Sequence, residues 1–329
     1  MPMTCPSCGH QWGGKRNPPT VDRKTTLANY DRLRSIQQDI LFNTYRFVFL
    51  SRRQVADTYF DAANPGKRSE LAGKHLAVLR SKGFVVEEQR HDQHDKKFYY
   101  PSPGGMFVCA TEEKQDARQV KRVKESQAHA ILSSIHSRHR QGINDVMTSF
   151  IKAERHGLGE LTYYAGDREV TYIFSAGGSR RRLQPDSTFL WSANGRGYLV
   201  WLELENSRAS VADLEAKILK YLLFESAGHN TGDAYRKALA VNRFPPLLVV
   251  AANPNQLPGL RQATLRGVLS AHVGTIPDVA KRVVIGLSYL DDVMDIGQLG
   301  ECWQAPLQGT GRLHKFEGLY ESSPSCRPK

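Results

Sequence analysis

The segment from residue 182 to residue 206 restricts the fold more than any other part of the chain. Asn194-Gly195 lies there between two apolar runs, and this dipeptide is the strongest short-range signal for a two-residue β-hairpin turn. If these two residues form the turn, cross-strand partners have numbers that sum to 194 + 195 = 389. Because the flanking runs are so apolar, we expect the hairpin to lie at the centre of a sheet rather than at its edge.

This register gathers acidic residues. Asp186 would lie opposite Glu203, since 186 + 203 = 389, and Glu205 would share the face of Glu203. Like charges placed opposite each other destabilise a sheet, so three converging carboxylates call for a cation. The remaining alternating side chains would point to the opposite, buried face: Phe189, Trp191, Val200, Leu202 and Leu204.

The chemistry of these ligands indicates the kind of cation. Hard carboxylate oxygens suit Mg²⁺ or Mn²⁺, which bind a few carboxylates together with water and substrate phosphate. We therefore expect Asp186, Glu203 and Glu205, with the Leu204 carbonyl, to hold one or two such ions. The alternative is an exposed acidic sheet edge without metal.

A helix is predicted directly after the hairpin. Ser210 is a good N-cap, Asp213 stands three residues later as in a capping box, and the helical pattern continues to about residue 226. Lys217 and Tyr221 are one turn apart and share a face. Lys217 can then reach the carboxylates and orient an attacking water or stabilise a pentavalent phosphorus. Alternatively it is an ordinary surface lysine, like Lys220.

The net charge of +12 and the pI near 9.5 favour a polyanionic partner. The excess is uneven. Residues 1–130 hold 22 basic and 14 acidic residues, or +8, and the other 199 residues hold 23 and 19, or +4. The N-terminal part is therefore the expected docking surface for nucleic acid.

The order of elements in residues 28–110 predicts a winged helix-turn-helix. Helical spacing begins at about residue 28 and includes Leu33, Ile36, Ile40, Leu41 and Tyr45. A second helix follows Ser51, and a turn at Asn64-Pro65-Gly66 precedes a third helix over 69–81, which ends at Gly83. Two β-like runs, 84–88 and 97–100, then form a hairpin that Pro101 ends.

In a winged helix the third helix enters the major groove and the wing flanks the backbone, so double-stranded DNA is the expected partner. The alternatives are that the basic side chains are merely solvated, or that the module binds protein. The residues expected to contact DNA are Lys67, Arg68, Lys74, Arg80 and Lys82 on the helix, with Lys96 and Lys97 on the wing.

The remaining segments carry weaker signals. Residues 1–27 are predicted to be a tail, in which Cys5, Cys8 and His10 resemble one zinc knuckle that lacks a second CxxC. Residues 111–150 are predicted to form a helical connector that ends inside the second domain, and residues 306–329 a C-terminal tail. The chain has no apolar stretch long enough for a membrane span or a signal peptide, and its five scattered cysteines make no disulfide framework. A cytoplasmic protein is expected.

Three short motifs carry a resemblance. Pro185-Asp186, then Glu203-Leu204-Glu205, then Lys217-xxx-Tyr221 resembles the core of the PD-(D/E)xK restriction-endonuclease-like superfamily. In that superfamily the aspartate and the first acid of (D/E)xK hold the metal. Glu205 stands here where the lysine is expected. Some branches carry a compensating lysine on the following helix, and Lys217 matches that position.

The arrangement over residues 35–305, and most strongly over 182–224, is similar to the replication-relaxation family of mobile genetic elements and to the C-class conjugative relaxases. The resemblance implies a winged helix followed by a nuclease-like α/β/α domain, residues 151–305, with a mixed central sheet. It also implies a metal-dependent nickase or endonuclease acting on plasmid or integrative-element DNA at an origin-like site. A homodimer and accessory mobilisation or replication proteins are compatible with it.

Several further residues are candidates within this hypothesis. Arg180, Arg181 and Arg182 could clamp the DNA backbone, and Glu160 could join the metal sphere through water, although it could also mark a helix end. A tyrosine-linked mechanism is less favoured because the His-hydrophobe-His motif of common relaxases is absent. Its conceivable nucleophiles are Tyr163, Tyr164 and Tyr221. The rival hypotheses are a DNA-binding regulator or accessory protein with an inactive nuclease fold, and an endonuclease that makes double-strand breaks.

Overall fold

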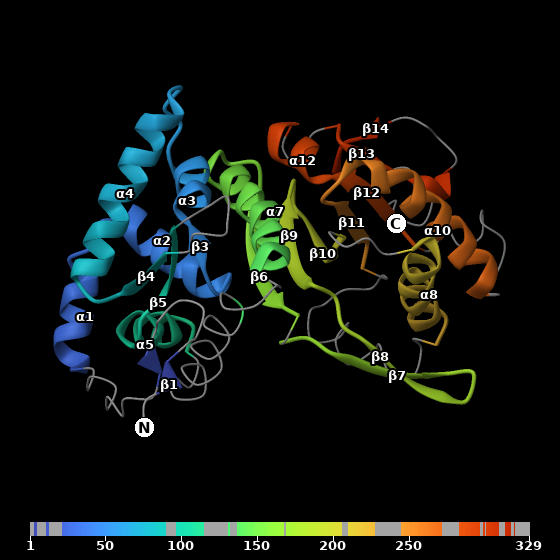
Figure 1. Ribbon diagram of the computed structural model, residues 1–329, viewed down its shortest axis with the longest axis horizontal. Helices are drawn as coiled ribbons and strands as arrows, with labels where there is room; N and C mark the ends of the chain where they lie inside the picture. Colours follow the sequence, from blue (N-terminus) through green and yellow to red (C-terminus); the bar gives the residue numbers. More distant parts are fainter. Residues whose placement is uncertain are drawn as a thin grey trace. The chain divides into compact units, whose positions relative to one another are not determined.

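A computed structural model describes residues 3–4, 11–12, 22–89, 97–114, 131, 137–167, 169–205, 210–227, 245–271, 283–296, 299, 301–308, 313–316 and 319. The chain forms two compact units, residues 1–55 with 62–130 and residues 56–61 with 131–329 (Figure 1). Of the helices described, none has the length and apolar character needed to cross a membrane.

The first unit begins with β1 (Met3–Thr4) and β2 (Gln11–Trp12), which pair antiparallel. The predicted zinc ligands Cys5, Cys8 and His10 lie between them, outside the described residues. The helices α1 (Arg23–Asp31) and α2 (Ser35–Arg46) follow. The helical spacing predicted from residue 28 is therefore divided between two helices. Ile40, Leu41 and Tyr45 of α2 are fully buried.

A capping box starts the next helix, as predicted. The Ser51 hydroxyl of β3 (Leu50–Ser51) accepts from the Gln54 N–H at 3.1 Å, and the Gln54 side-chain carbonyl accepts from the Ser51 N–H at 2.8 Å. Two of the first free N–H groups of α3 (Arg52–Tyr59) are thereby satisfied.

The third predicted helix is longer than the sequence indicated. The Asn64 side chain accepts from the Gly66 N–H at 2.8 Å, so α4 (Pro65–Ser81) begins at Pro65 rather than at residue 69. Asn-Pro-Gly is a helix cap here and not a separate turn, because proline is well suited to a first helical position. Gly83, with φ +76°, follows the helix end as predicted.

The predicted hairpin is present as β4 (Val85–Gln89) and β5 (Lys97–Pro101), which join β3 in the order β3-β5-β4. Its connection and Lys96 lie outside the described residues. An unpredicted helix, α5 (Pro103–Glu112), follows, with Ser102 as its N-cap. Gly105 lets α5 pack closely against the backbone of Phe84, since a Cβ at that position would lie 2.1 Å from the Phe84 carbonyl oxygen.

The second unit is built on a mixed sheet. Among its described residues seven strands pair in the order β14-β13-β12-β11-β10-β9-β6. The strands β10, β11 and β12 are parallel, and the other pairings are antiparallel. The strands are β6 (Glu160–Gly166), β9 (Ser187–Ala193), β10 (Arg196–Glu205), β11 (Leu247–Ala251), β12 (Ile285–Tyr289), β13 (Trp303–Gln304) and β14 (Leu313–His314).

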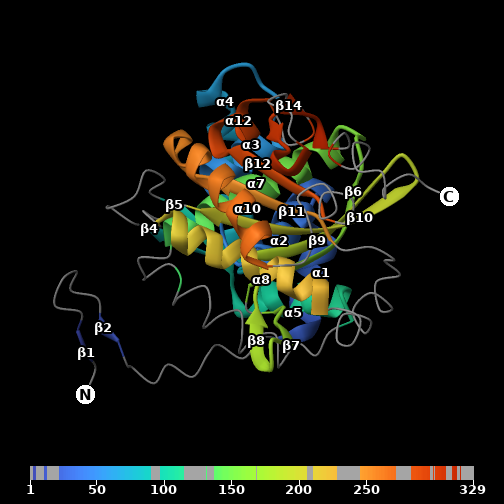
Figure 2. The same cartoon turned by 90° about the vertical axis from the view of Figure 1, so that its right-hand side faces the viewer.

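Helices cover both faces of this sheet. α8 (Val211–Ala227) and α10 (Leu257–Ala271) pack together on one face, and α7 (Ser137–Arg155) and α12 (Leu290–Ile296) lie on the other (Figures 1 and 2). The 3-10 turns η1 (Pro254–Gln256) and η2 (Pro306–Gln308) and a separate ribbon of β7 (Tyr172–Ala176) with β8 (Ser179–Leu183) complete the unit. The chain is therefore α/β with a mixed central sheet, as predicted.

The central hairpin has the predicted register. All pairs between β9 and β10, from Arg196–Ala193 to Leu202–Ser187, have numbers that sum to 389. Asn194 (φ 52°) and Gly195 (φ 71°) form the turn with the two positive φ angles of a type I′ hairpin. Because β10 also pairs with β11, the hairpin is central, and the alternative of an exposed acidic edge does not hold.

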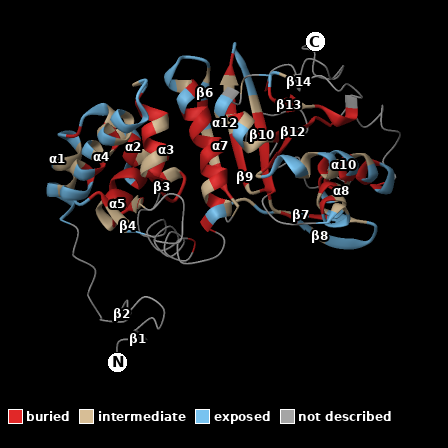
Figure 3. Cartoon of the chain, turned by 45° about the horizontal axis from the view of Figure 1, so that its top comes forward, coloured by how far each residue is buried: buried red, intermediate tan, exposed pale blue. Residues whose placement is uncertain are grey.

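Two segments predicted to be peripheral contribute to this core. The described part of the predicted connector includes most of α7, which is largely buried (Figure 3). Its Ile143, Val146 and Phe150 are fully buried. Phe150 packs against Phe189 and Trp191, with ring centroids 4.7 and 5.2 Å apart. The segment predicted as a C-terminal tail supplies β14 and the buried Phe316 and Leu319.

We predict that Gly142→Ala destabilises the protein. A Cβ on Gly142 of α7 would lie 2.5 Å from Leu204 Cδ2 of β10, in a packed interior. Overpacking costs roughly 1–3 kcal/mol, and the higher helix propensity of alanine returns only about 1 kcal/mol. The measurement is chemical unfolding followed by circular dichroism. Gly259→Ala in α10 is the control, because its nearest atom would be Val211 Cγ2 at 3.6 Å. A Gly142→Ala protein as stable as the control would contradict the close packing of α7 on β10.

Candidate active site

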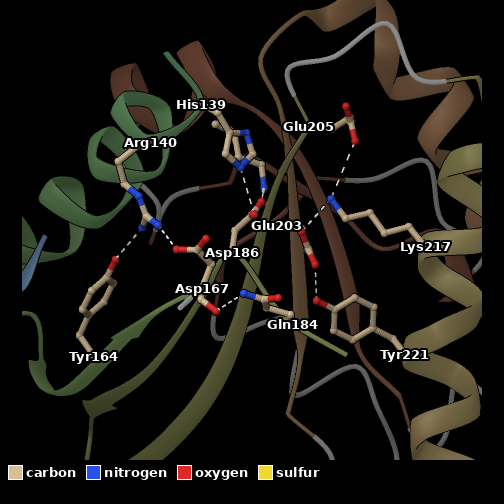
Figure 4. Close-up of polar contacts among 11 residues, drawn as sticks. His139, Arg140, Tyr164, Asp167, Gln184, Asp186, Glu203, Glu205, Lys217 and Tyr221 are labelled. Carbon is tan, nitrogen blue, oxygen red and sulfur yellow. Dashed lines mark hydrogen bonds and ion pairs between the residues drawn. The ribbon is translucent and has the colours of Figure 1, made fainter. Parts of the chain in front are cut away.

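The predicted site residues meet at one end of the central strands (Figure 4). Asp186 immediately precedes β9, and Glu203 and Glu205 are among the last three residues of the neighbouring strand β10, at the end away from the hairpin turn. α8 supplies Lys217 and Tyr221. Its N-terminus has the predicted capping box, in which the Asp213 N–H donates to the Ser210 hydroxyl at 3.2 Å and the Asp213 carboxylate accepts from the Ser210 N–H at 3.0 Å.

Glu203 is the most deeply buried of the acids, with 4% of its side chain exposed. One carboxylate oxygen accepts from the Tyr221 hydroxyl and the other lies 2.7 Å from Lys217 Nζ. Burial, followed by the negative charge of Asp186, raises the pKa of Glu203 to about 8, and Lys217 and Tyr221 offset this only in part. Because burial is the main cause, the protonated form of Glu203 is favoured up to about pH 8.

Lys217 reaches back from α8 over the sheet. Its Nζ lies 2.7 Å from Glu203 and 3.9 Å from Glu205, whose side chain is also buried. Burial opposes the charged form of the lysine, but the negative charges of Glu203 and Asp186 outweigh it and raise the pKa of Lys217. Lys220, by contrast, is exposed on the same helix. Lys217 is therefore a cation held within the carboxylate cluster.

Asp186 lies one residue beyond the last paired position of the hairpin, where its carboxylate is free to leave the plane of the ladder. It accepts from the Leu204 N–H at 2.8 Å and lies 3.0 Å from His139 Nε2 of α7. Burial alone would raise the pKa of Asp186, but the His139 hydrogen bond and the charges of His139 and Lys217 hold it well below its usual range. The charge of Asp186 thus raises the pKa of Glu203, although the two residues are not a paired position of the hairpin.

The sequence pattern did not identify two further residues near the carboxylates, His139 and its neighbour Arg140. Arg140 is buried, donates to Asp167 and contacts the Tyr164 hydroxyl at 3.5 Å, and the charge of Asp186 helps to raise the pKa of Arg140 after burial lowers it (Figure 4). A signal was present, because position 139 is one turn before the apolar Ile143 and so lies on the inward face of α7. The interpretation of residues 111–150 as a connector does not reveal this inward-facing position.

Other sequence candidates lie farther from the carboxylates or are poorly suited to nucleophilic attack. Glu160 pairs with Ser192, whereas Gly166 pairs with Ser187, so Glu160 is at the far end of β6, about 17 Å along the strand from the Asp186 end. Glu160 is the first residue of β6 and does not mark the end of a helix. Burial raises the pKa of Tyr163, raises that of Tyr164 to about 12, and raises that of Tyr221 well above 10.

The carboxylate oxygens of Asp186, Glu203 and Glu205 are the groups that could hold a divalent ion. Their chemistry suits Mg²⁺ or Mn²⁺, which prefer hard carboxylate oxygens. In the described part of the chain, however, no three His, Cys, Asp or Glu side chains already stand close enough together to form a metal cluster. A bound ion would therefore require the acids to exchange some of their contacts with Lys217 and His139.

The residues predicted to bind DNA fall in both units. On α4, Lys67 and Lys74 flank Glu70 at 3.4 and 2.6 Å, and Lys82 is the C-cap. Arg80 and Lys97 both pair with Glu87, at 3.1 and 3.0 Å. Arg68 is half-buried on α4, and Arg181 and Arg182 lie on β8 of the other unit. Surface ion pairs of this kind are weak, so a phosphate can replace the acidic partner.

Comparison with known families places the chain. The replication-relaxation family matches residues 44–235, which is more than half of the chain. The matched range includes α3, α4 and the β4–β5 hairpin as well as the site elements from α7 to α8. No curated protein and no solved structure matched the chain.

We predict a proton-linked loss of stability that depends on Glu203. Its pKa is raised from an ordinary 4.5 to about 8, so between these values the folded state holds a proton that the unfolded state releases. Stability contributed by this group therefore falls as pH rises from 4.5 to 8, by an amount on the order of 3–5 kcal/mol. In EDTA, Glu203→Gln should flatten the fall in melting temperature over this range.

The matched control is Glu70→Gln, an exposed acid of α4 whose pKa is lowered by its hydrogen bond to Lys74 and by Lys67. This control should keep the wild-type fall. If Glu203→Gln retains the same pH slope as the wild type, the raised pKa is wrong.

Proposed function

The chain belongs to the replication-relaxation family, and we propose that it is a metal-dependent DNA nickase or endonuclease for the replication or mobilisation of a plasmid or other mobile element. One observation carries the proposal. Asp186, Glu203 and Glu205 converge at one end of the sheet, with the Lys217 ammonium 2.7 Å from Glu203. Two buried glutamates, a partly buried aspartate and one lysine can supply metal ligands and a cation for phosphodiester hydrolysis with a divalent ion.

The sequence pattern and the geometry support the proposal in complementary ways. Pro185-Asp186 and Glu203-Leu204-Glu205 resemble the PD-(D/E)xK pattern with Glu205 in place of the lysine. A lysine that arrives from the next helix can supply the missing cation, and Lys217 lies among the acids. A mixed sheet with helices on both faces is consistent with a nuclease-like domain of this superfamily.

We assign Asp186, Glu203 and Glu205, with the Leu204 carbonyl, as the residues that would hold Mg²⁺ or Mn²⁺. The donor set fits such an ion, because these are hard oxygens and the acids outnumber the nearby lysine. When bound, the ion supplies Lewis-acid stabilisation of the scissile phosphate and an activated water.

The chain's own residues then have defined tasks in hydrolysis. A water oxygen forms the new bond to phosphorus as one ester P–O bond breaks. The water gives up one proton and the departing oxygen gains one, so no net proton is consumed in this exchange. Lys217 stabilises the charge that builds on the phosphate. The Tyr221 hydroxyl fixes the rotamer of Glu203, and His139 fixes Asp186. Attack by water is favoured over attack by tyrosine, because the buried Tyr221 hydroxyl donates to Glu203 and has a raised pKa.

The first unit would select the DNA. Its α2, α3 and α4 followed by the β4–β5 hairpin follow the element order of a winged helix-turn-helix, with Lys67 and Lys74 on the helix that would enter the major groove. An origin-like duplex is the expected target, and accessory proteins or a second copy of the chain can take part.

The alternative is a DNA-binding accessory or regulator with an inactive nuclease-like domain. Two observations favour it: glutamate occupies the usual lysine position, and the described residues contain no ready-made group of three metal ligands. An enzyme that makes double-strand breaks would share the chemistry of the nickase and differ in its products.

A relaxation assay on supercoiled plasmid carrying the protein's neighbouring genomic DNA tests the proposal. Mg²⁺ or Mn²⁺ should convert the plasmid to open circles, and EDTA should prevent it. We expect Lys217→Ala to lower the rate about 10²–10³-fold, because one charge-stabilising group is lost, and Asp186→Ala to lower it to background. Lys220→Ala, on the same helix but exposed, should cut like the wild type.

Each other outcome has a defined meaning. An inactive wild type that still binds the duplex would support the accessory protein. Linear product would indicate double-strand breaks. Cleavage that survives Asp186→Ala would show that the site has been assigned to the wrong residues.

A further inference from the structure

The β7–β8 ribbon stands apart from the main sheet. Its two strands pair only with each other among the described residues, and Gly177 and Gly178, with φ of 59° and 74°, form the turn at its tip. The ribbon projects from its unit below α8 (Figure 1). The chain passes from Leu183, the last residue of β8, through two residues to Asp186. The base of the ribbon is therefore next to the candidate active site.

Aromatic packing fixes the inner face of the ribbon. Tyr172 and Phe174 contact Phe224 of α8, with ring centroids 5.4 and 5.2 Å apart, and Tyr172 contacts Trp201 of β10 at 5.5 Å. Trp201 in turn packs on Tyr221 at 5.2 Å, whose hydroxyl donates to Glu203. A chain of rings thus joins the ribbon to the carboxylates, and the ribbon is held in a defined direction relative to them.

The outer face has a different character. Cross-strand pairing places Ile173 beside Arg182 and Ser175 beside Arg180. All four side chains are exposed, and Ile173, at 48% exposure, is one of the few large apolar side chains on the described surface. Arg181 shares the inner face with Phe174. Residues 172–183 contain three arginines and no acid.

We propose that this ribbon docks in the major groove of duplex DNA beside the phosphodiester that the acids cleave. The inference rests on the proposed function, since it takes DNA as the substrate. The major groove admits a two-stranded β-ribbon, whereas the major groove of A-form RNA is too narrow. Arg180 and Arg182 contact phosphates, and Ile173, which lies beside Arg182, contacts an apolar feature of the groove, such as a thymine methyl group.

The dimensions fit this partner. Five residues of extended chain span about 17 Å, the length of about five base pairs at roughly 3.4 Å each. The glycine tip carries no side chain, so the backbone can approach the groove closely. The DNA footprint of the second unit then extends about five base pairs to one side of the cut.

The test measures binding and not cleavage. Fluorescence anisotropy of the full-length protein with a labelled duplex of ~30 base pairs in EDTA, over about 50–300 mM NaCl, gives the affinity and its salt dependence. Arg180→Ala with Arg182→Ala should reduce the salt slope by about 2 and weaken binding about 10- to 30-fold near 150 mM salt. Ile173→Ser should weaken binding by about fivefold without changing the slope.

The control removes the same charge elsewhere in the same unit. Arg261 and Arg266 are exposed on α10, and replacing both with alanine should leave the slope within about 0.5 of the wild type. Equal losses for both double variants would overturn the proposal, because net charge alone would then account for binding. So would wild-type binding that is no stronger for the duplex than for one of its single strands.

Failure of the proposed function gives a different result. A wild type that binds no DNA would overturn both proposals. A wild type that binds and cuts while Arg180→Ala with Arg182→Ala matches it would overturn the ribbon alone.

Discussion

The buried contact between the Lys217 ammonium and the Glu203 carboxyl group is the interaction on which the second unit depends. Glu203 occupies a strand residue between β9 and β11, a position that an apolar side chain would fill at no electrostatic cost. An isolated charge there would cost several kcal/mol, and Asp186 adds to that cost. Lys217 and the Tyr221 hydroxyl offset it, which requires α8 to lie directly over β10. The same requirement brings Trp201, Phe224 and the ribbon into one aromatic cluster.

Local rules predicted the centre of the fold well. Asn-Gly fixed both the turn and the register of β9 with β10, because a two-residue hairpin leaves only one pairing scheme. Ser210 and Asp213 located the start of α8, which in turn set Lys217 and Tyr221 one turn apart on the face toward the acids. The mixed α/β class and most elements of the first unit followed from periodicity, although α5 was not predicted and α4 begins at Pro65 rather than at residue 69.

What could not be predicted depends on contacts between distant segments. His139 and Arg140 reach the site only because α7 packs on the sheet, and nothing local separates such a helix from a connector. Asp186 follows the register but leaves the ladder to accept from the Leu204 N–H, a choice that the sequence pattern does not determine. The sequence pattern did not indicate the β7–β8 ribbon, because its two strands pair with each other rather than with the main sheet. The roles of the acids, the metal and the DNA contacts remain predictions.

The connection between β10 and β11 has a consequence for the order of folding. The β9–β10 hairpin closes through a two-residue turn and can form within about 1–10 μs, whereas parallel pairing of β10 with β11 requires the long crossover that contains α8. Until then the hairpin holds Asp186 and Glu203 close together without their lysine. Glu203 must therefore keep a proton or remain in water during this interval. Docking of α8 is therefore also the step that brings Lys217 to these acids.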